Sequence, residues 1–353
     1  MTLLYAEVPR FYAEAERASD ASLADRPVIV GGDPRKRGTV QGATEDALAA
    51  GVAIGMPVLE ALELCPGARV RRTDMRAYRD LGARLRALFR RAVPRVEPAG
   101  LEAAYLDGSE TPEPLEALAR RLQDEVRDAL RLPLRVGIAP VKFVAKLAAE
   151  EADASGVRRV GADEIRAFLR PLPVGRLPGV GPHTLAAFRD LGVVTAGDLA
   201  AASRSAVEDR LGNHGLALLG AAQGHGEARL RPAPHSRSLS QESTLADSER
   251  DAAVLERVLR DLAASLAAAL ARERLATRRL VLKVRYGDAE TVTRSQTLPR
   301  ALAAPDELAE RGLELLWRTQ AGDRAVRLLG LAAFQLTARP RDDRQLRLFA
   351  GDE

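Results

Sequence analysis

The alternation of hydrophobic and polar positions predicts a mixed α/β region at the start of the chain. An apolar strand at 3–7 and a helix at about 11–18 are followed by a second strand at 27–30. Thr44 is a suitable N-cap for a short helix that Gly51 ends. These elements predict a small subdomain inserted after the first strand.

A second group of elements follows from position 71, where the pattern becomes that of a long Arg/Leu helix. It continues with a strand-turn-strand at 95–106, an amphipathic helix at 114–130, a strand at 134–138 and a helix from Val141. Two helices against one antiparallel sheet resemble the split βαβ arrangement. We therefore expect an α+β region up to about residue 160.

The pattern changes at residues 162–229, where short helices are joined by Gly and Pro turns and no strand is expected. Residues 230–235 contain two prolines and predict an extended linker. A last α+β module follows, and beyond Ala338 we expect disorder up to a terminal pentapeptide. The predicted elements of that module are a helix at 248–275, strands at 279–286 and 291–297, a helix at 305–319 and a strand at 325–336.

Length and composition indicate a globular protein of two to four domains. The 353 residues are 46% hydrophobic and 29% charged, which excludes a disordered or fibrous chain. No apolar run is long enough to span a bilayer, and the N-terminal residues do not have the basic start and apolar core of a signal peptide. We therefore expect a cytoplasmic protein without membrane contact.

Cysteine and histidine are too sparse for a metal cage, whereas arginine is abundant. Cys65 is the only cysteine, and the four histidines are too widely spread for a zinc site. Only four of the 53 basic residues are lysine, and the sequence pI is about 9.5. Guanidinium groups suit phosphate contact. A GC-rich genome explains the same bias equally well, so composition alone does not establish nucleic-acid binding.

The helical region contains a candidate phosphate-binding turn at Gly179-Val180-Gly181, between two helix-like stretches. The glycines let the backbone approach a ligand, and free N–H groups at the start of the next helix bind DNA phosphate without reading sequence. This pattern is a helix-hairpin-helix signature, although a plain interhelical turn is the alternative. Residues 212–215 form a weaker candidate for a second turn of the same kind.

Basic residues gather on one predicted strand of the last module. Arg278, Arg279, Lys283 and Arg285 lie on this strand, and Arg294 falls on its expected hairpin partner. A basic sheet face suits phosphate contact beside a groove. An edge strand protected by its charges is the alternative.

The terminal pentapeptide is a candidate docking segment. The apolar side chains of Leu346, Leu348 and Phe349 follow a polar leader, and Gln345 supplies a directional hydrogen bond. Burying three such side chains in a partner's pocket, less the cost of ordering the tail, predicts micromolar affinity. An edge strand that folds back on the last module is the alternative.

Taken together, the order of modules and several motifs resemble the Y-family, or translesion, DNA polymerases, with the bacterial polymerase IV type closest. The motifs are Phe11-Tyr12-Ala13, Gly55-Met56-Pro57, Leu101 to Asp107, Ala139 to Phe143 with Ala145-Lys146, and Leu177 to Gly181. The resemblance implies a right-hand-like fold around primer-template DNA. It implies a ferredoxin-like palm at 1–9 and 72–161, fingers at 10–71, an all-α helix-hairpin-helix thumb at 162–229, the linker at 230–235, an α+β little finger at 236–338 and a disordered tail at 339–353.

The same resemblance implies three carboxylates that hold two Mg²⁺ ions, and here the set is altered. The family's first-strand Asp falls on Glu7, its hairpin Asp on Glu102 and its hairpin Glu on Ala103. The longer Glu displaces its oxygens from near-ideal octahedral geometry, and alanine cannot bind a metal. Misalignment, or rescue by Asp107 or Glu97, is the alternative.

The positions that hold the nucleotide in the family are altered as well. The family's finger Tyr and Arg fall on Glu45 and Leu48, and its palm Lys falls on Asp153. Two carboxylates here repel a triphosphate. Tyr12 keeps the aromatic side chain that screens against a ribose 2′ hydroxyl, although it also suits simple packing.

These losses resemble the catalytically degenerate branch of the family typified by ImuB, whose chains usually carry a longer C-terminal extension. We predict a catalytically inactive adaptor without cofactor, active in DNA damage tolerance and the SOS response. Its expected partners are primer-template DNA, the bacterial sliding clamp, and another polymerase or mutasome protein. The clamp is expected because the tail peptide resembles the peptide by which bacterial polymerases bind it. The alternatives are an active low-fidelity polymerase that uses Glu7, Glu102 and Mg²⁺, and a structural DNA binder without affinity for the clamp.

Overall fold

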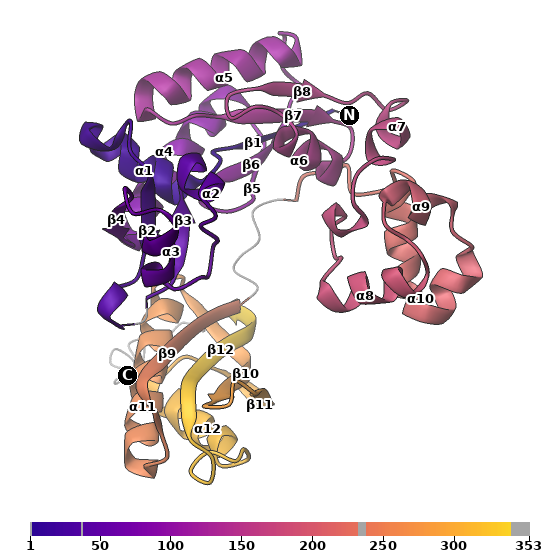
Figure 1. Ribbon diagram of the computed structural model, residues 1–353. Helices are drawn as coiled ribbons and strands as arrows, with labels where there is room; N and C mark the ends of the chain where they lie inside the picture. Colours follow the sequence, from indigo (N-terminus) through magenta and orange to yellow (C-terminus); the bar gives the residue numbers. More distant parts are fainter. Residues whose placement is uncertain (1, 37, 232–237, 340–353) are drawn as a thin grey trace, which may run out of the picture. The chain divides into compact units, whose positions relative to one another are not determined.

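The computed structural model describes residues 2–36, 38–231 and 238–339 (Figure 1). The chain divides into two compact units, Met1–Ala233 and Pro234–Glu353. Most of the predicted linker and the predicted docking peptide Gln345–Phe349 lie outside the described residues.

A five-stranded sheet with the order β5-β6-β1-β7-β8 is the centre of the first unit. Its strands are β1 (Leu3–Glu7), β5 (Val96–Pro98), β6 (Ala103–Asp107), β7 (Arg135–Ala139) and β8 (Val157–Arg159). The strands β5, β6, β1 and β7 pair antiparallel, whereas β8 adds a parallel edge to β7. The predicted purely antiparallel sheet is therefore wrong at β8, a three-residue strand too short to give a periodic signal.

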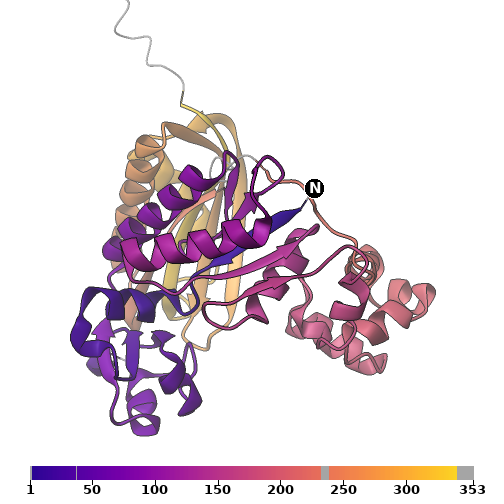
Figure 2. The same ribbon diagram turned by 90° about the horizontal axis from the view of Figure 1, so that it is seen from above.

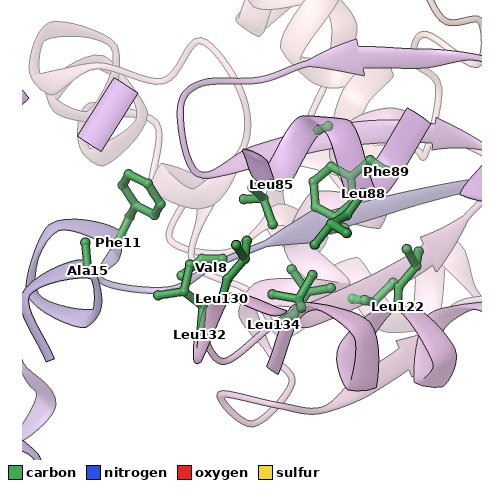
Figure 3. Packing of buried hydrophobic residues seen from close by; sticks show 14 of the residues in the cluster. Val8, Phe11, Ala15, Leu85, Leu88, Phe89, Leu122, Leu130, Leu132 and Leu134 are labelled. Carbon is green, nitrogen blue, oxygen red and sulfur yellow. The ribbon is translucent and has the colours of Figure 1, made fainter. Parts of the chain in front are cut away.

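Helices cover both faces of this sheet. Successive side chains along each strand point to opposite faces, so each face has its own hydrophobic core. Leu4 and Ala6 pack toward α4 (Met75–Ala92) and α5 (Leu115–Leu130), whose Leu85, Leu88, Phe89 and Leu122 are seen in Figure 3. Figure 2 shows α5 lying across that face. On the opposite face, Tyr5 and Ala103 pack with α6 (Lys142–Glu150).

Glycine lets α6 approach the sheet closely. A Cβ added at Gly137 on β7 would lie 1.9 Å from the backbone oxygen of Ala145 on α6. Any side chain at this position would therefore push α6 away from the strand that lies beside Glu7.

A second, three-stranded sheet has the order β3-β2-β4. Its elements are α1 (Phe11–Ser19), η1 (Ala21–Leu23), β2 (Val28–Gly31), η2 (Pro34–Lys36), β3 (Val40–Ala43), α2 (Glu45–Ala49), α3 (Val58–Leu64) and β4 (Arg69–Arg72). The predicted start of the long helix at Arg71 is wrong because that residue belongs to β4. The helix begins at Met75, after Asp74 caps it by accepting hydrogen bonds from two backbone N–H groups.

The last part of the first unit is helical, as predicted from its Gly and Pro turns. Its elements are α7 (Ile165–Leu169), η3 (Val174–Arg176), α8 (Pro182–Asp190), α9 (Ala196–Ala201) and α10 (Arg204–Ala222). Thr195 and Asp198 form a capping box at the start of α9. Gly212 has a φ of 58° and interrupts α10 at the predicted second turn.

The second unit is a four-stranded antiparallel sheet, β11-β10-β12-β9, with two helices packed against it. Its elements are β9 (Ser238–Glu249), α11 (Ala252–Arg272), β10 (Leu275–Tyr286), β11 (Thr291–Leu302), α12 (Pro305–Leu316) and β12 (Val326–Ala338). The predicted helix start at Ser248 is wrong because this residue still belongs to the strand β9, and the helix begins at Ala252. The polar sequence of β9 suits an edge strand and gave no strand signal.

Candidate functional site

The strand register places Glu7 between two side chains on one face of the central sheet. Across β1 and β6, Glu7 lies directly opposite Ala103, and across β1 and β7 it lies opposite Arg135. The Arg135 Nη2 donates a hydrogen bond to Glu7 Oε1 at 3.1 Å. The predicted first metal position is therefore occupied by an ion pair within the sheet.

The ion pair is largely withdrawn from solvent. The Glu7 side chain is 16% exposed and that of Arg135 18% exposed. Burial raises the pKa of Glu7, and the guanidinium of Arg135 opposes that rise. In the described part of the chain, neither Glu7 Oε2 nor Arg135 Nε has a hydrogen-bond partner, although both atoms are buried.

Glu7 and Glu102 share a pocket of about 270 Å³. The residues that line it are Glu7, Val8, Arg10, Phe11, Tyr12, Gln41, Gly42, Ala43, Leu48, Ile54 and Glu102. Glu102 lies just before β6, and its backbone oxygen accepts a hydrogen bond from the N–H of Val8 at 3.0 Å. Ala103, the third predicted metal position, is 1% exposed and lacks an oxygen for a metal.

Neither alternative carboxylate completes the site. Asp107 lies opposite Leu3, at the other end of β1 from Glu7, and its Oδ2 is 3.1 Å from Arg95 Nε. Glu97 Oε2 accepts a hydrogen bond from Lys142 Nζ at 2.6 Å. Among the described residues, no group of three or more His, Cys, Asp or Glu side chains forms a metal-binding cluster. The residues present therefore do not fit a site for two magnesium ions.

Two of the four predicted nucleotide positions lie in this pocket, and two do not. Tyr12 lines it and stacks on Tyr78, with ring centroids 4.8 Å apart. Leu48 also lines it and presents an apolar side chain that is 37% exposed. Glu45 is outside the lining, and Asp153 is an exposed residue of the loop before β8.

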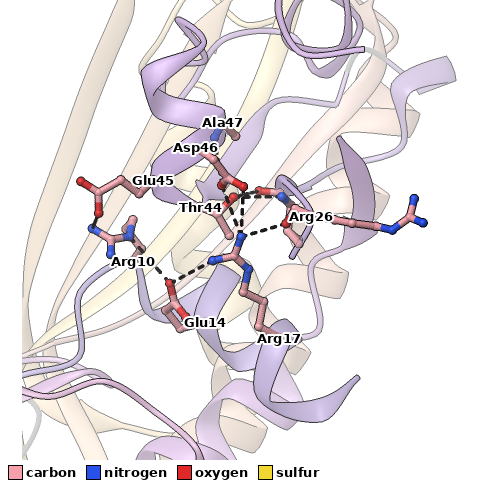
Figure 4. A network of polar contacts seen from close by, with 9 residues as sticks. Arg10, Glu14, Arg17, Arg26, Thr44, Glu45, Asp46 and Ala47 are labelled. Carbon is pink, nitrogen blue, oxygen red and sulfur yellow. Dashed lines mark hydrogen bonds and ion pairs between the residues drawn. The ribbon is translucent and has the colours of Figure 1, made fainter. Parts of the chain in front are cut away.

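An arginine pairs with the carboxylate at position 45 (Figure 4). Arg10 Nη1 lies 3.0 Å from Glu45 Oε2, and Arg10 Nε lies 3.8 Å from Glu14 Oε1. Arg10 adopts a left-handed conformation with a φ of 52° at the start of α1. Arg10 and Arg135 were not predicted as site residues. Each lies at the start of a helix or strand, where an arginine is usually exposed to solvent.

The predicted phosphate-binding turn is an exposed turn that leads into α8. Gly179 has a φ of 90°, a conformation that glycine adopts without steric cost, and Gly181 is the N-cap of α8. Val180 is half-buried beneath them. A Cβ added at Gly179 would lie 3.4 Å from His214 Cε1, so this turn and the one at Gly212 are neighbours. The geometry suits backbone contact with phosphate.

The sheet of the second unit carries three of the predicted basic residues on one face. Arg279, Lys283 and Arg285 alternate along β10 and lie on the side away from the helices, and Lys283 is paired with Glu242 at 3.0 Å. Arg278 lies at a bulge between Thr277 and Arg279.

Arg294 does not belong to this basic face. It is on the predicted partner strand, β11, but it lies opposite Leu282, whose side chain is buried against the helices. Its Nε donates a hydrogen bond to the backbone oxygen of Arg318 at 3.0 Å. The expectation that Arg294 joins the other basic residues on one sheet face is therefore wrong.

In the ranges that the structure describes, no helix has the length and apolar character needed to cross a bilayer. Comparison with known protein families gives three matches. Residues 7–150 match the impB/mucB/samB family, residues 236–348 match the C-terminal domain of that family, and residues 162–193 match the IMS family HHH motif.

Curated relatives extend the similarity over nearly the whole chain. The chain is 36% identical to DNA polymerase IV of Alkalilimnicola ehrlichii, over 98% of this chain and 99% of the relative. It is also 36% identical to DNA polymerase IV of Methanoculleus marisnigri, over 93% of this chain and 92% of the relative. The chain therefore belongs to the impB/mucB/samB family of Y-family DNA polymerases.

A solved structure has the same fold. A Y-family DNA polymerase chimera of Dbh and Dpo4 matches with a TM-score of 0.87 at 22% identity, covering 96% of this chain and all of that chain. The predicted α+β multidomain fold with a palm, fingers, helix-hairpin-helix thumb and little finger is confirmed. The name DNA polymerase IV that the relatives share supports the predicted alternative, an active polymerase, better than it supports an inactive adaptor.

Proposed function

We propose that this protein binds primer-template DNA during translesion synthesis without extending the primer itself. The observation that carries the proposal is the pairing of Glu7 with Arg135 directly opposite Ala103. A Y-family site for two metals needs free carboxylates at both positions. In this chain the carboxylate of Glu7 is paired with Arg135, and Ala103 has only a methyl group.

The charges around Glu7 oppose metal binding. Mg²⁺ requires near-ideal octahedral oxygen ligands, and Ala103 supplies none. The Arg135 guanidinium already neutralises Glu7 and repels a second cation at the same carboxylate. Of the two carboxylates that line the pocket, Glu7 is taken by Arg135 and only Glu102 remains, and one carboxylate does not hold the two metals of this chemistry.

The nucleotide positions oppose catalysis in the same way. Leu48, which lines the pocket, offers no hydrogen bond to a phosphate. Outside the lining, Glu45 is paired with Arg10, and Asp153 carries a negative charge. An incoming triphosphate therefore has neither a metal nor a cationic side chain at these three positions to offset its own charge.

The surfaces that suit DNA do not depend on a metal. The exposed backbone at Gly179 and Gly181 supports a contact with phosphate that ignores sequence. The side chains of Arg279 and Arg285 on the open face of β10 support a second contact with the DNA backbone. Binding without chemistry is the function that these features support together.

We further propose that the tail peptide tethers the protein to the sliding clamp in the cytoplasm, and that a partner polymerase or mutasome protein carries out synthesis during the SOS response. Replacing Leu348 and Phe349 by Ala should weaken clamp binding at least tenfold, because two of three apolar anchors are lost. Surface plasmon resonance on immobilised clamp measures this loss, and DNA affinity should stay unchanged. Equal clamp affinity in the variant would reject the tether.

The names of the relatives favour a second candidate, an active low-fidelity polymerase that uses Mg²⁺ with Glu7 and Glu102. The two candidates differ in how nucleotide affects DNA affinity. An active polymerase should hold a dideoxy-terminated primer-template more tightly when Mg²⁺ and the matching nucleotide are added. Our proposal predicts that, at a fixed Mg²⁺ concentration, the dissociation constant measured by fluorescence anisotropy is the same with and without the matching nucleotide. A tightening that depends on the matching nucleotide would support the polymerase instead.

A further inference from the structure

We infer that Arg135 replaces the metal ion as the permanent positive charge at this site, so that the palm is stable with no divalent cation bound. This inference rests on the proposed function and deepens it by naming the group that stabilises the altered site. Arg135 is thus a positioning residue for Glu7 and takes no part in chemistry.

The register between β1 and β7 places Arg135 directly opposite Glu7. Glu7 has two direct neighbours in the sheet, Ala103 and Arg135, and side chains directly opposite one another have Cβ atoms about 5 Å apart. On one side Ala103 presents only a methyl group, while from the other side Arg135 donates a hydrogen bond of 3.1 Å to Glu7. The loss of a carboxylate on β6 and the presence of a cation on β7 therefore act on the same oxygen atoms.

The burial of this pair distinguishes it from surface ion pairs. Of the ion pairs between described residues, only Arg135–Glu7 and Lys142–Glu97 have both side chains less than 20% exposed. By contrast, Arg159, on the edge strand β8, and its partner Glu116, on α5, are 57% and 39% exposed. A buried carboxylate needs a partner because water no longer solvates it, whereas an exposed one does not.

Charge balance explains why a metal is dispensable. A cluster of three carboxylates repels itself until cations bind, so such a site depends on its metals. Here one buried carboxylate, Glu7, faces one guanidinium, and this pair is neutral within the protein. The pairing of Arg10 with Glu45 gives the same result on the finger side of the pocket.

Thermal unfolding of the full-length protein tests this inference. Four proteins are compared in EDTA, in 10 mM Mg²⁺ and in 10 mM Mn²⁺: the wild type, Arg135→Ala, Arg135→Ala with Glu7→Gln, and the control Arg159→Ala. A metal that binds the folded state raises Tm. Because we expect no metal to bind, the wild-type Tm should be the same in all three solutions to within about 1 °C. Arg135→Ala should lower Tm by about 5 °C or more, and Arg159→Ala by less than about 2 °C.

The double variant separates the loss of a charge partner from a general packing defect. Glu7→Gln should recover most of the Tm lost in Arg135→Ala, because a neutral amide needs no counter-charge. No recovery, or a wild-type Tm that rises by several degrees with Mn²⁺, would overturn the inference. If Arg135→Ala does not fold, the wild type and the double variant still decide it. Primer extension by the wild type would refute the proposed function but leave these Tm results to be judged separately.

Discussion

The two faces of the little-finger sheet give a prediction with its own internal control. Arg279 and Arg285 lie on the open face of β10, whereas Arg294 lies opposite Leu282 on the helix-covered side of the register. If the open face contacts the DNA backbone, Arg279→Ala and Arg285→Ala should each remove one phosphate contact. Arg294→Ala removes the same charge from the molecule without removing a contact.

The expected size follows from counterion release. Each phosphate contact contributes about −0.9 to the slope of log K against log salt for duplex DNA, so one lost contact makes the slope shallower by about 0.9 and weakens binding about eightfold at 0.1 M salt. Lys283→Ala should have a smaller effect than Arg285→Ala, because Lys283 is already paired with Glu242 at 3.0 Å. The Arg294→Ala slope should equal that of the wild type.

Fluorescence anisotropy with a labelled primer-template between 50 and 300 mM NaCl measures all five slopes in EDTA. The assignment of faces is refuted if Arg294→Ala changes the slope as much as Arg285→Ala does, or if neither open-face variant changes it. A parallel loss in every variant would indicate that net charge, rather than a docked sheet face, governs binding.

Further predictions concern the thumb and the altered site. Gly179→Ala should lower the free energy of unfolding, measured in urea, by about 1 kcal/mol and weaken DNA binding, because a φ of 90° strains an alanine. Gly181 has a φ of −99° and open space around it, so Gly181→Ala should leave the free energy of unfolding unchanged. Burial raises the pKa of Glu7, so the folded state holds that proton more tightly than the unfolded state. The free energy of unfolding of the wild type relative to Glu7→Gln should therefore fall as the pH rises from about 4 through the raised pKa, and a difference that grows over this range would contradict the direction of the shift.

Local sequence was enough to predict features that depend on neighbouring residues. The strand Leu3–Glu7 and the turn at Gly179 were both read from short patterns, and the structure has them at those positions. The replacement at Ala103 was likewise visible in the sequence, because a missing side chain needs no three-dimensional context.

Features that depend on strand register could not be predicted. Arg135 lies 128 residues from Glu7, and only the pairing of β1 with β7 brings the two together. The face of Arg294 depends on the register of the hairpin, since a shift of one residue would turn its side chain to the other side. β9 was missed because its polar sequence forms a strand through pairing with β12 rather than through a hydrophobic pattern.

Single-turnover primer extension tests the central claim most directly. Protein in excess over a labelled primer-template is incubated with all four nucleotides and Mg²⁺ or Mn²⁺, beside a Glu7→Ala variant purified in the same way. Because Ala103 and the Glu7–Arg135 pair leave no site for two metals, we expect that neither protein adds a nucleotide. Template-directed extension by the wild type that disappears in Glu7→Ala would contradict it.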